Sequence, residues 1–69
     1  MKRYEALRVS SIPYSNNFLV QGQRPDTLNW EPICRGLEWE NEQLAENYIK
    51  GLAKKEGIKA FNKCGYEIK

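Results

Sequence analysis

Lysines near the C-terminus are the residues of this chain whose type and spacing could do chemistry. Residues 50–69 contain six lysines against two glutamates, a net charge of +4. A lysine ammonium is a compact point charge that binds phosphate oxygens. Four of them are candidates for contact with a nucleic-acid backbone: Lys50, Lys54, Lys59 and Lys63. Binding of a nucleic acid is therefore one hypothesis for this chain.

The helix dipole offers a simpler explanation of the same lysines. The segment EQLAENYIKGLAKKEG is acidic in its first half and has Lys50 and Lys54 in its second half. Cations near the C-terminus of a helix stabilise it by about 0.3–1 kcal/mol each. Glu46 and Lys50 also have the spacing of a helical ion pair. A DNA-reading sheet needs basic side chains, yet Arg24 is the only basic residue between residues 9 and 34. Nucleic-acid binding is therefore the alternative hypothesis.

Residues suited to catalysis are sparse. The sequence has no histidine, the usual general base near neutral pH. Cys34 and Cys64 cannot complete a zinc site of four ligands without histidines. Cys64 has only Lys63 beside it to activate the thiol. Glu38 and Glu40 resemble paired carboxylates, but they more simply solvate the entrance to a helix. We therefore predict a non-enzymatic protein with no catalytic residues, no metal and no cofactor.

Size and composition indicate one folded domain, residues 1–69. The chain is 41% hydrophobic and 29% charged, which is typical of a globular protein. A core of this size contributes only about 3–5 kcal/mol and leaves little room for a deep cleft. The overall charge of +2 is too small to indicate an acidic membrane surface. Two cysteines and a start without an apolar run predict a cytoplasmic protein with reduced thiols and no membrane contact.

Turn-forming residues divide the chain into short predicted elements. Three segments rich in β-branched or aromatic residues are predicted strands: Arg3–Ser11, Asn17–Gln23 and Leu28–Arg35. A helix is predicted at about residues 41–56. Residues 58–61 and 66–69 then form a hairpin, which we favour, or a short helix and one strand. The predicted fold is α+β: an antiparallel sheet of three N-terminal strands plus a C-terminal strand or hairpin, covered on one face by the helix.

The predicted helix has an apolar stripe and a recognisable start. The stripe collects Ala45, Tyr48, Ile49 and Leu52. Asn41 is the better N-cap by side-chain type, whereas Glu40 would place a glutamine at the capping-box position. Gly51 inside the helix costs about 1 kcal/mol relative to alanine. A close approach of the helix to the sheet would explain this glycine.

Alternation along the predicted strands separates two faces of the sheet. The predicted core face collects Leu7, Val9, Phe18, Val20, Leu28, Trp30 and Cys34, with Tyr66 and Ile68. The opposite face collects Tyr4, Ala6, Leu19 and Ile33, interleaved with Arg8, Gln21, Glu31 and Arg35. One helix covers only one face of a small sheet, so the second face is predicted to present a mixed stripe to water. A contiguous stripe of this kind is typical of an interface.

The leading hypothesis is a protein-binding module, a small regulator or inhibitor that occludes a partner protein or associates with a second copy of itself. The candidate interface residues are Tyr4, Leu19, Ile33, Arg8, Glu31 and the exposed loop residue Tyr14. Tyrosine in an exposed loop is common, but tyrosine is also enriched at binding hot spots. Under the alternative hypothesis, the four lysines bind a nucleic acid.

Overall fold

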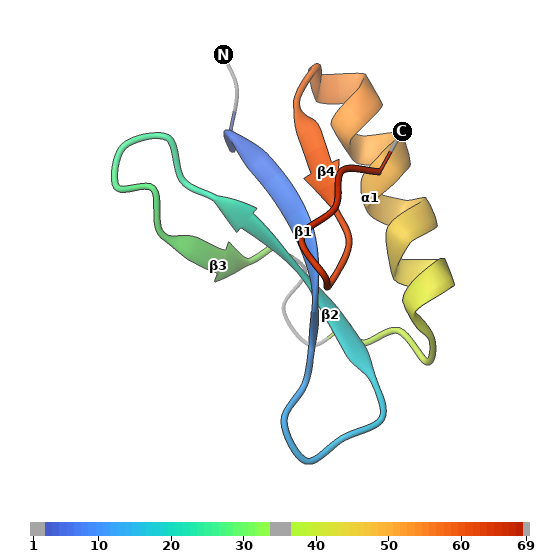
Figure 1. The fold of residues 1–69 in the computed structure, drawn as a ribbon. Helices are drawn as coiled ribbons and strands as arrows, with labels where there is room; N and C mark the ends of the chain where they lie inside the picture. The colour runs from blue at the N-terminus through green and yellow to red at the C-terminus, as the bar shows by residue number, and fades with distance from the viewer. Residues whose placement is uncertain (1–2, 34–36, 69) are drawn as a thin grey trace.

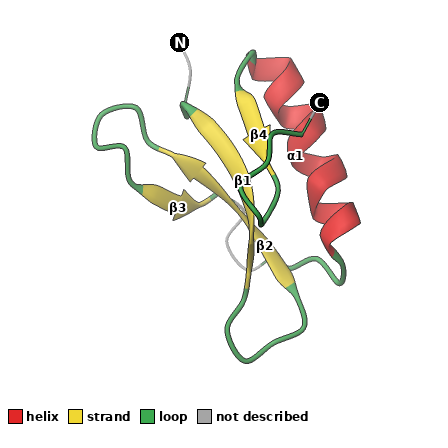
Figure 2. Ribbon diagram, viewed as in Figure 1, coloured by secondary structure: helices red, strands yellow, loops and turns green. Residues whose placement is uncertain are grey.

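A computed structural model of the chain describes residues 3–33 and 37–68. The elements follow in the order β1 (Ala6–Ser11), β2 (Phe18–Gln23), β3 (Trp30–Pro32), α1 (Glu42–Glu56) and β4 (Lys59–Phe61). They form one sheet with the strand order β3-β2-β1-β4 and one helix on one of its faces (Figures 1 and 2). The predicted α+β class is confirmed.

The sheet is mostly antiparallel but contains one parallel pair. β1 pairs with β2, and β2 with β3, in antiparallel fashion, whereas β4 runs parallel to β1. The reason is the course of α1, which returns the chain along the sheet to the end at which β1 begins (Figure 1). The predicted sheet was antiparallel throughout, so this pair is a difference from the sequence prediction.

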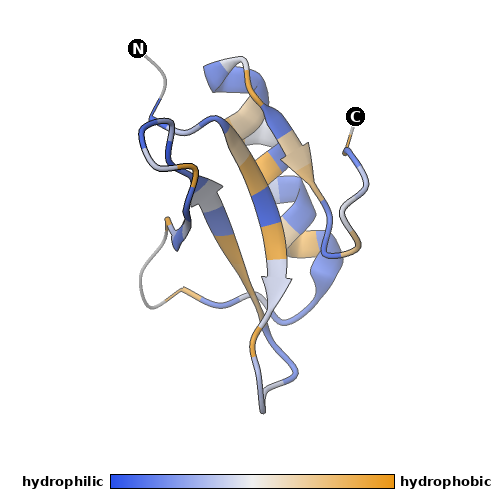
Figure 3. Cartoon of the chain, turned by 60° about the vertical axis from the view of Figure 1, so that its left-hand side comes forward, coloured by the Kyte–Doolittle hydropathy of each residue, from blue (hydrophilic) through white to orange (hydrophobic). Residues whose placement is uncertain are grey.

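The core lies between α1 and the three strands β1, β2 and β4. Among the described residues, seven buried ones make it up: Leu7, Val9, Val20, Ala45, Ile49, Ala53 and Ala60. Hydrophobic and hydrophilic residues alternate along β1 (Figure 3), which sends one set of side chains toward the helix. α1 contacts β1, β2 and β4 but, among the described residues, makes no contact with β3. β3 therefore lies outside the part of the sheet that α1 covers.

Local signals define both ends of α1. The side chain of Asn41 accepts a hydrogen bond from the Leu44 amide at 2.9 Å, which identifies Asn41 rather than Glu40 as the N-cap. At the other end, Gly57 has a left-handed φ of 70°, and its N–H donates to the carbonyl of Ala53. Both caps satisfy backbone groups that would otherwise lack partners.

Gly51 has a different environment from the one expected. A methyl group added at Gly51 would meet nothing within 4 Å, and the residue is exposed. The predicted close approach of helix to sheet at this position is therefore wrong. Nothing in the described structure explains a glycine here.

Gly51→Ala is consequently expected to stabilise the protein. Alanine restricts the unfolded chain and suits a helix better, so the free energy of unfolding should rise by about 1 kcal/mol. Urea denaturation followed by circular dichroism would measure the change. A loss of stability would mean that α1 is in closer contact with a neighbour at this position than the geometry indicates.

The register of β3 corrects the predicted faces of the sheet. Gln23 pairs with Trp30, and Gly22 pairs with Glu31. Since Gly22 also lies opposite the buried Leu7, Glu31 belongs to the helix-side face and Trp30 to the opposite face. The sequence assigned both residues the other way round. Leu28 was also assigned to the core, yet it lies in the turn before β3, is 60% exposed and has a φ of 63°.

The cause of this reversal is the geometry of the turn and of Gly22. The turn is closed by hydrogen bonds from Leu28 N to Arg24 O and from Arg24 N to Asn29 O, both 2.8 Å. The turn sets the register in which Glu31 lies opposite Gly22, and Gly22 faces the core side because it pairs with Leu7. Side chains of Tyr4 and Ile33 fill the space above this glycine, where an added Cβ would lie only 2.5 and 2.8 Å from their nearest atoms. The predicted position of Tyr4 and Ile33 on the uncovered face is therefore wrong.

The C-terminal segment forms the favoured hairpin rather than a second helix. A bridge joins Phe61 to Glu67, and Ile68 N donates to Ala60 O at 2.8 Å. Asn62 closes the turn, since its side chain accepts hydrogen bonds from the amides of Cys64 and of residue 66. Ile68 packs against the core as predicted. Tyr66 does not: it is 73% exposed, which corrects its assignment to the core face. Two further assignments, Cys34 and Arg35, lie outside the described residues.

Candidate functional site

The sheet face that points away from α1, called the open face below, is the candidate site. Strand pairing places ten residues on it: Ala6, Arg8, Ser10, Leu19, Gln21, Gln23, Trp30, Pro32, Lys59 and Phe61. Figure 3 views the sheet from this side, with the helix behind it. Pro32 and Lys59 are exposed and most of the others are half-buried. The open face therefore mixes apolar, amide and cationic groups.

Arg8, Gln21 and Trp30 form an ordered cluster on the open face, with one residue each from β1, β2 and β3. The guanidinium carbon of Arg8 lies 4.2 Å from the centre of the Trp30 ring. The Arg8 Nε–H donates to Oε1 of Gln21 at 2.7 Å. Trp30 reaches Arg8 diagonally across β2, because Arg8 lies opposite Gln21 and Trp30 opposite Gln23. A cation stacked on tryptophan is a favourable contact, and the hydrogen bond fixes its direction.

The charge of Arg8 is not neutralised within the described residues. The ion pairs among the described residues join Arg24 to Asp26 at 3.1 Å and Arg24 to Glu31 at 3.8 Å. The hydrogen bond from Arg24 lowers the pKa of Asp26 and correspondingly raises that of Arg24. Glu31 is thus directed toward the β2–β3 turn. Among the described residues, only the Nε–H of Arg8 has a hydrogen-bond acceptor, so its other guanidinium N–H groups can donate to a partner.

The predicted interface residues are only partly brought together. Arg8 and Leu19 lie on the open face, as expected. Tyr4, Ile33 and Glu31 do not, because their side chains belong to the helix-side face. The predicted grouping of Tyr4, Leu19 and Ile33 is therefore wrong.

Tyr14 lies in the β1–β2 loop, beyond the end of the sheet that carries Leu19. It is fully exposed and has a φ of 65°, a left-handed conformation that favours glycine. The turn around it is closed by a hydrogen bond from Ser15 N to Ile12 O at 3.2 Å. Its predicted exposure is confirmed, whereas its predicted part in an interface stays a prediction.

Trp30 is the important residue of the open face that sequence reasoning missed. Its large apolar ring favoured a place in the core. The available signal was Pro32, which identified β3 as an edge strand. On an edge strand that extends past α1, a tryptophan can be half-buried under a neighbouring arginine instead of inside the core.

The four candidate lysines occupy two different places. Lys50, Lys54 and Lys59 line one groove between α1 and β4. Lys63 lies near the other end of the helix, where its ammonium is 5.4 Å from the centre of the Phe18 ring and its amide donates to Glu42. The predicted ion pair between Glu46 and Lys50 is not among the interactions of the described residues, so this prediction is wrong.

The described residues give little support to a metal site or a membrane-spanning segment. Residues 3–33 and 37–68 contain no group of three or more potential metal ligands of the histidine, cysteine or carboxylate type. No helix of these residues combines the length and the apolar character needed to cross a membrane. Cys64 is a free, exposed thiol.

Comparisons with protein-family models, with curated proteins and with solved structures found no match to this chain.

Proposed function

We propose that this chain is a non-enzymatic protein-binding module that uses its open face to hold another protein or a second copy of itself. The observation that supports this proposal most strongly is the Arg8–Trp30 contact at 4.2 Å, ordered by Gln21, on a face that α1 leaves uncovered. The expected location is the cytoplasm, where the exposed Cys64 thiol would stay reduced.

The residue types of the open face suit a protein partner. Tryptophan and arginine are the residues most enriched at interface hot spots. Leu19, Pro32 and Phe61 add apolar area around the cluster. An arginine that is already stacked and hydrogen-bonded loses little conformational freedom when a partner binds, which favours affinity.

The shape of the open face suggests how the module would act. A sheet surface can cover a partner but cannot enclose a small substrate. A regulator or inhibitor that occludes a larger protein's surface is the corresponding activity. The partner surface should offer a carboxylate or carbonyl acceptor to Arg8 and an apolar contact to Trp30.

Leu19→Lys and Arg8→Glu are the variants that test the proposal. Both change the open face without removing a residue of the buried core. Each should weaken association by about tenfold or more, because an unpaired charge would be desolvated in the interface. Affinity capture from the native cells with nuclease treatment, and sedimentation velocity for self-association, would measure the loss.

Leu44→Lys is the matched control, since Leu44 is 48% exposed on α1, away from the open face. It should retain the partner or the dimer. The proposal is contradicted if all three variants behave as the unmodified chain does. It is equally contradicted if nuclease alone releases every captured protein.

Binding to a nucleic acid is the second candidate function, supported by the presence of Lys50, Lys54 and Lys59 around one groove. Such binding should be weak and should fall steeply with salt, since few phosphates would be neutralised. Titration of a labelled duplex at two salt concentrations would test it. Tight, sequence-dependent binding at physiological salt would reverse the ranking of the two candidates.

A further inference from the structure

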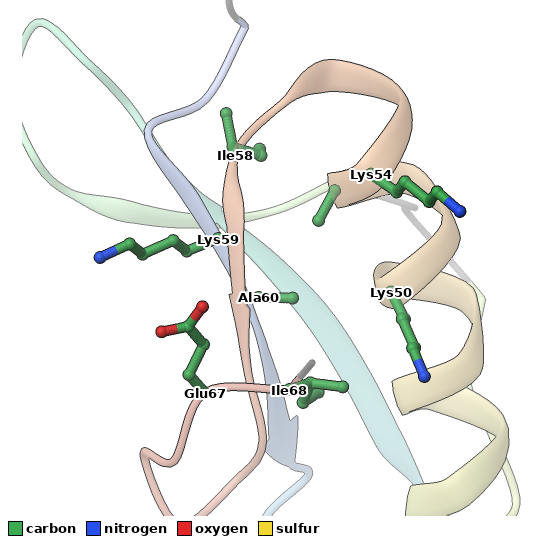
Figure 4. A pocket seen from close by; sticks show the side chains of 8 residues that line it. Lys50, Lys54, Ile58, Lys59, Ala60, Glu67 and Ile68 are labelled. Atoms are coloured by element: carbon green, nitrogen blue, oxygen red, sulfur yellow. The ribbon is translucent and has the colours of Figure 1, made fainter.

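The groove between the second half of α1 and β4 is a separate feature from the open face. Its volume is about 350 Å³, and Figure 4 shows the side chains that line it. Its apolar lining consists of Ala53, Ile58, Ala60 and Ile68. This volume is near the lower end of the range for small-molecule sites, which are usually concave and apolar with a few polar groups.

Small residues create the hollow. Ala53 on the helix and Ala60 on β4 are both buried and have only a methyl side chain each. Figure 4 shows Ala60 and Ile68 pointing toward α1. Half-buried Ile58 and Ile68 supply larger apolar walls. The floor therefore offers apolar contact to a chain or ring, but no hydrogen-bonding side chain.

Two lysines give the helix side of the groove a positive charge. Lys50 and Lys54 are four residues apart on α1, which places them on the same side of the helix. Both are exposed, and within the described residues neither forms an ion pair. Lys59 and Glu67 have opposite charges and point away from α1, to the other side of β4 (Figure 4). Among the described residues that line the groove, the positive charge on the α1 side therefore lies with Lys50 and Lys54.

We propose that this groove binds a small amphiphilic carboxylate, with its alkyl or aryl part on the apolar floor and its anionic head at Lys50 and Lys54. A polyphosphate chain fits less well. Lysines that follow a nucleic-acid backbone should extend along one surface, whereas Lys63 lies near the other end of the helix. An apolar floor also adds nothing to phosphate binding.

Three probes of one series test the two parts of the ligand. Octanoate has both the apolar chain and the carboxylate, 1-octanol lacks the charge, and acetate lacks the chain. Titration of the full chain, followed by amide chemical shifts in NMR spectra, should show saturable binding of octanoate. The shifts should concentrate at Ala53, Ile58, Ala60 and Ile68. Octanol and acetate should bind about five- to tenfold more weakly or not at all.

The double variant Lys50→Gln/Lys54→Gln isolates the charge. Glutamine has nearly the helix propensity of lysine, so the fold should be retained. Octanoate affinity should fall by about five- to tenfold. Lys55→Gln is the matched control, because Lys55 lies next to Lys54 but does not line the groove. It should bind octanoate as the unmodified chain does.

Several results would overturn this inference. Equal affinity for octanol and octanoate would remove any role for the lysines, as would unchanged binding by the double variant. Shifts confined to the open face would place the ligand elsewhere. Displacement of octanoate by a DNA duplex at low salt, with tighter binding of the duplex, would assign the groove to nucleic acid instead. The variants of the open face lie on the other side of the sheet, so a loss of octanoate binding and a loss of partner binding can be told apart.

Discussion

Ile49→Ala is expected to lower the free energy of unfolding by about 2–5 kcal/mol. Ile49 is completely buried between α1 and the sheet, together with Leu7, Val9 and Val20. Its removal loses apolar contact and leaves a cavity that helix and sheet cannot fully close. A single core of this size supplies only about 3–5 kcal/mol in total, so the variant should be largely unfolded at room temperature. Circular dichroism and urea denaturation would measure the loss.

Leu44→Ala provides the comparison for this experiment. It removes a side chain of the same size from the same helix, but Leu44 is 48% exposed. Its effect should stay within about 0.5 kcal/mol of zero. Equal effects of the two substitutions would show that α1 does not bury the stripe that contains Ile49. A folded and cooperative Ile49→Ala protein would lead to the same conclusion.

Gly22→Ala is expected to destabilise the protein by about 1–3 kcal/mol through overpacking. The new methyl group would lie 2.5 Å from Cδ1 of Tyr4 and 2.8 Å from Cγ2 of Ile33. Both distances are too short for carbon atoms, so side chains or backbone must move. The thermal unfolding midpoint should fall accordingly. Gly51→Ala is the internal control, since the same substitution in open space should raise the midpoint.

A double-mutant cycle makes this prediction specific for Tyr4. If the Tyr4 ring covers Gly22, Gly22→Ala should cost less when Tyr4 is already alanine, and the two effects should not add. Strict additivity would mean that Tyr4 lies elsewhere. In that case the position of Tyr4 on the helix-side face would have to be abandoned.

The sequence alone determined the helix, because its signals are local. Asn41 at the start, Gly57 at the end and the stripe of Ala45 and Ile49 act within a few residues of one another. The two long strands were equally clear. Alternation in β1 and β2 assigned Leu7 and Val20 to the core, and both are buried. These assignments required no information about residues that are distant in the sequence.

The face of β3 was decided only by the tertiary structure. A strand of three residues alternates equally well in either register, and a shift by one residue exchanges its two faces. The turn containing Leu28 and the space above Gly22 selected the register. As a result Trp30 joined Arg8 on the open face, while Ile33 moved to the core side. No local pattern contains this information, since it depends on pairing across β2.

The candidate sites show the same division. The sequence identified an uncovered face and a group of lysines as the features to test. The sequence could not predict that Arg8 lies 4.2 Å from the Trp30 ring. Nor could it predict that Lys50 and Lys54 line one groove with Ala60 and Ile68, whereas Lys63 does not. The first arrangement follows from pairing across β2, which joins β1 to β3. The second follows from the parallel pairing of β4 with β1, a long-range contact whose geometry the course of α1 determines. The sequence therefore indicated which residue types could form a site, whereas the fold decided which residues became neighbours.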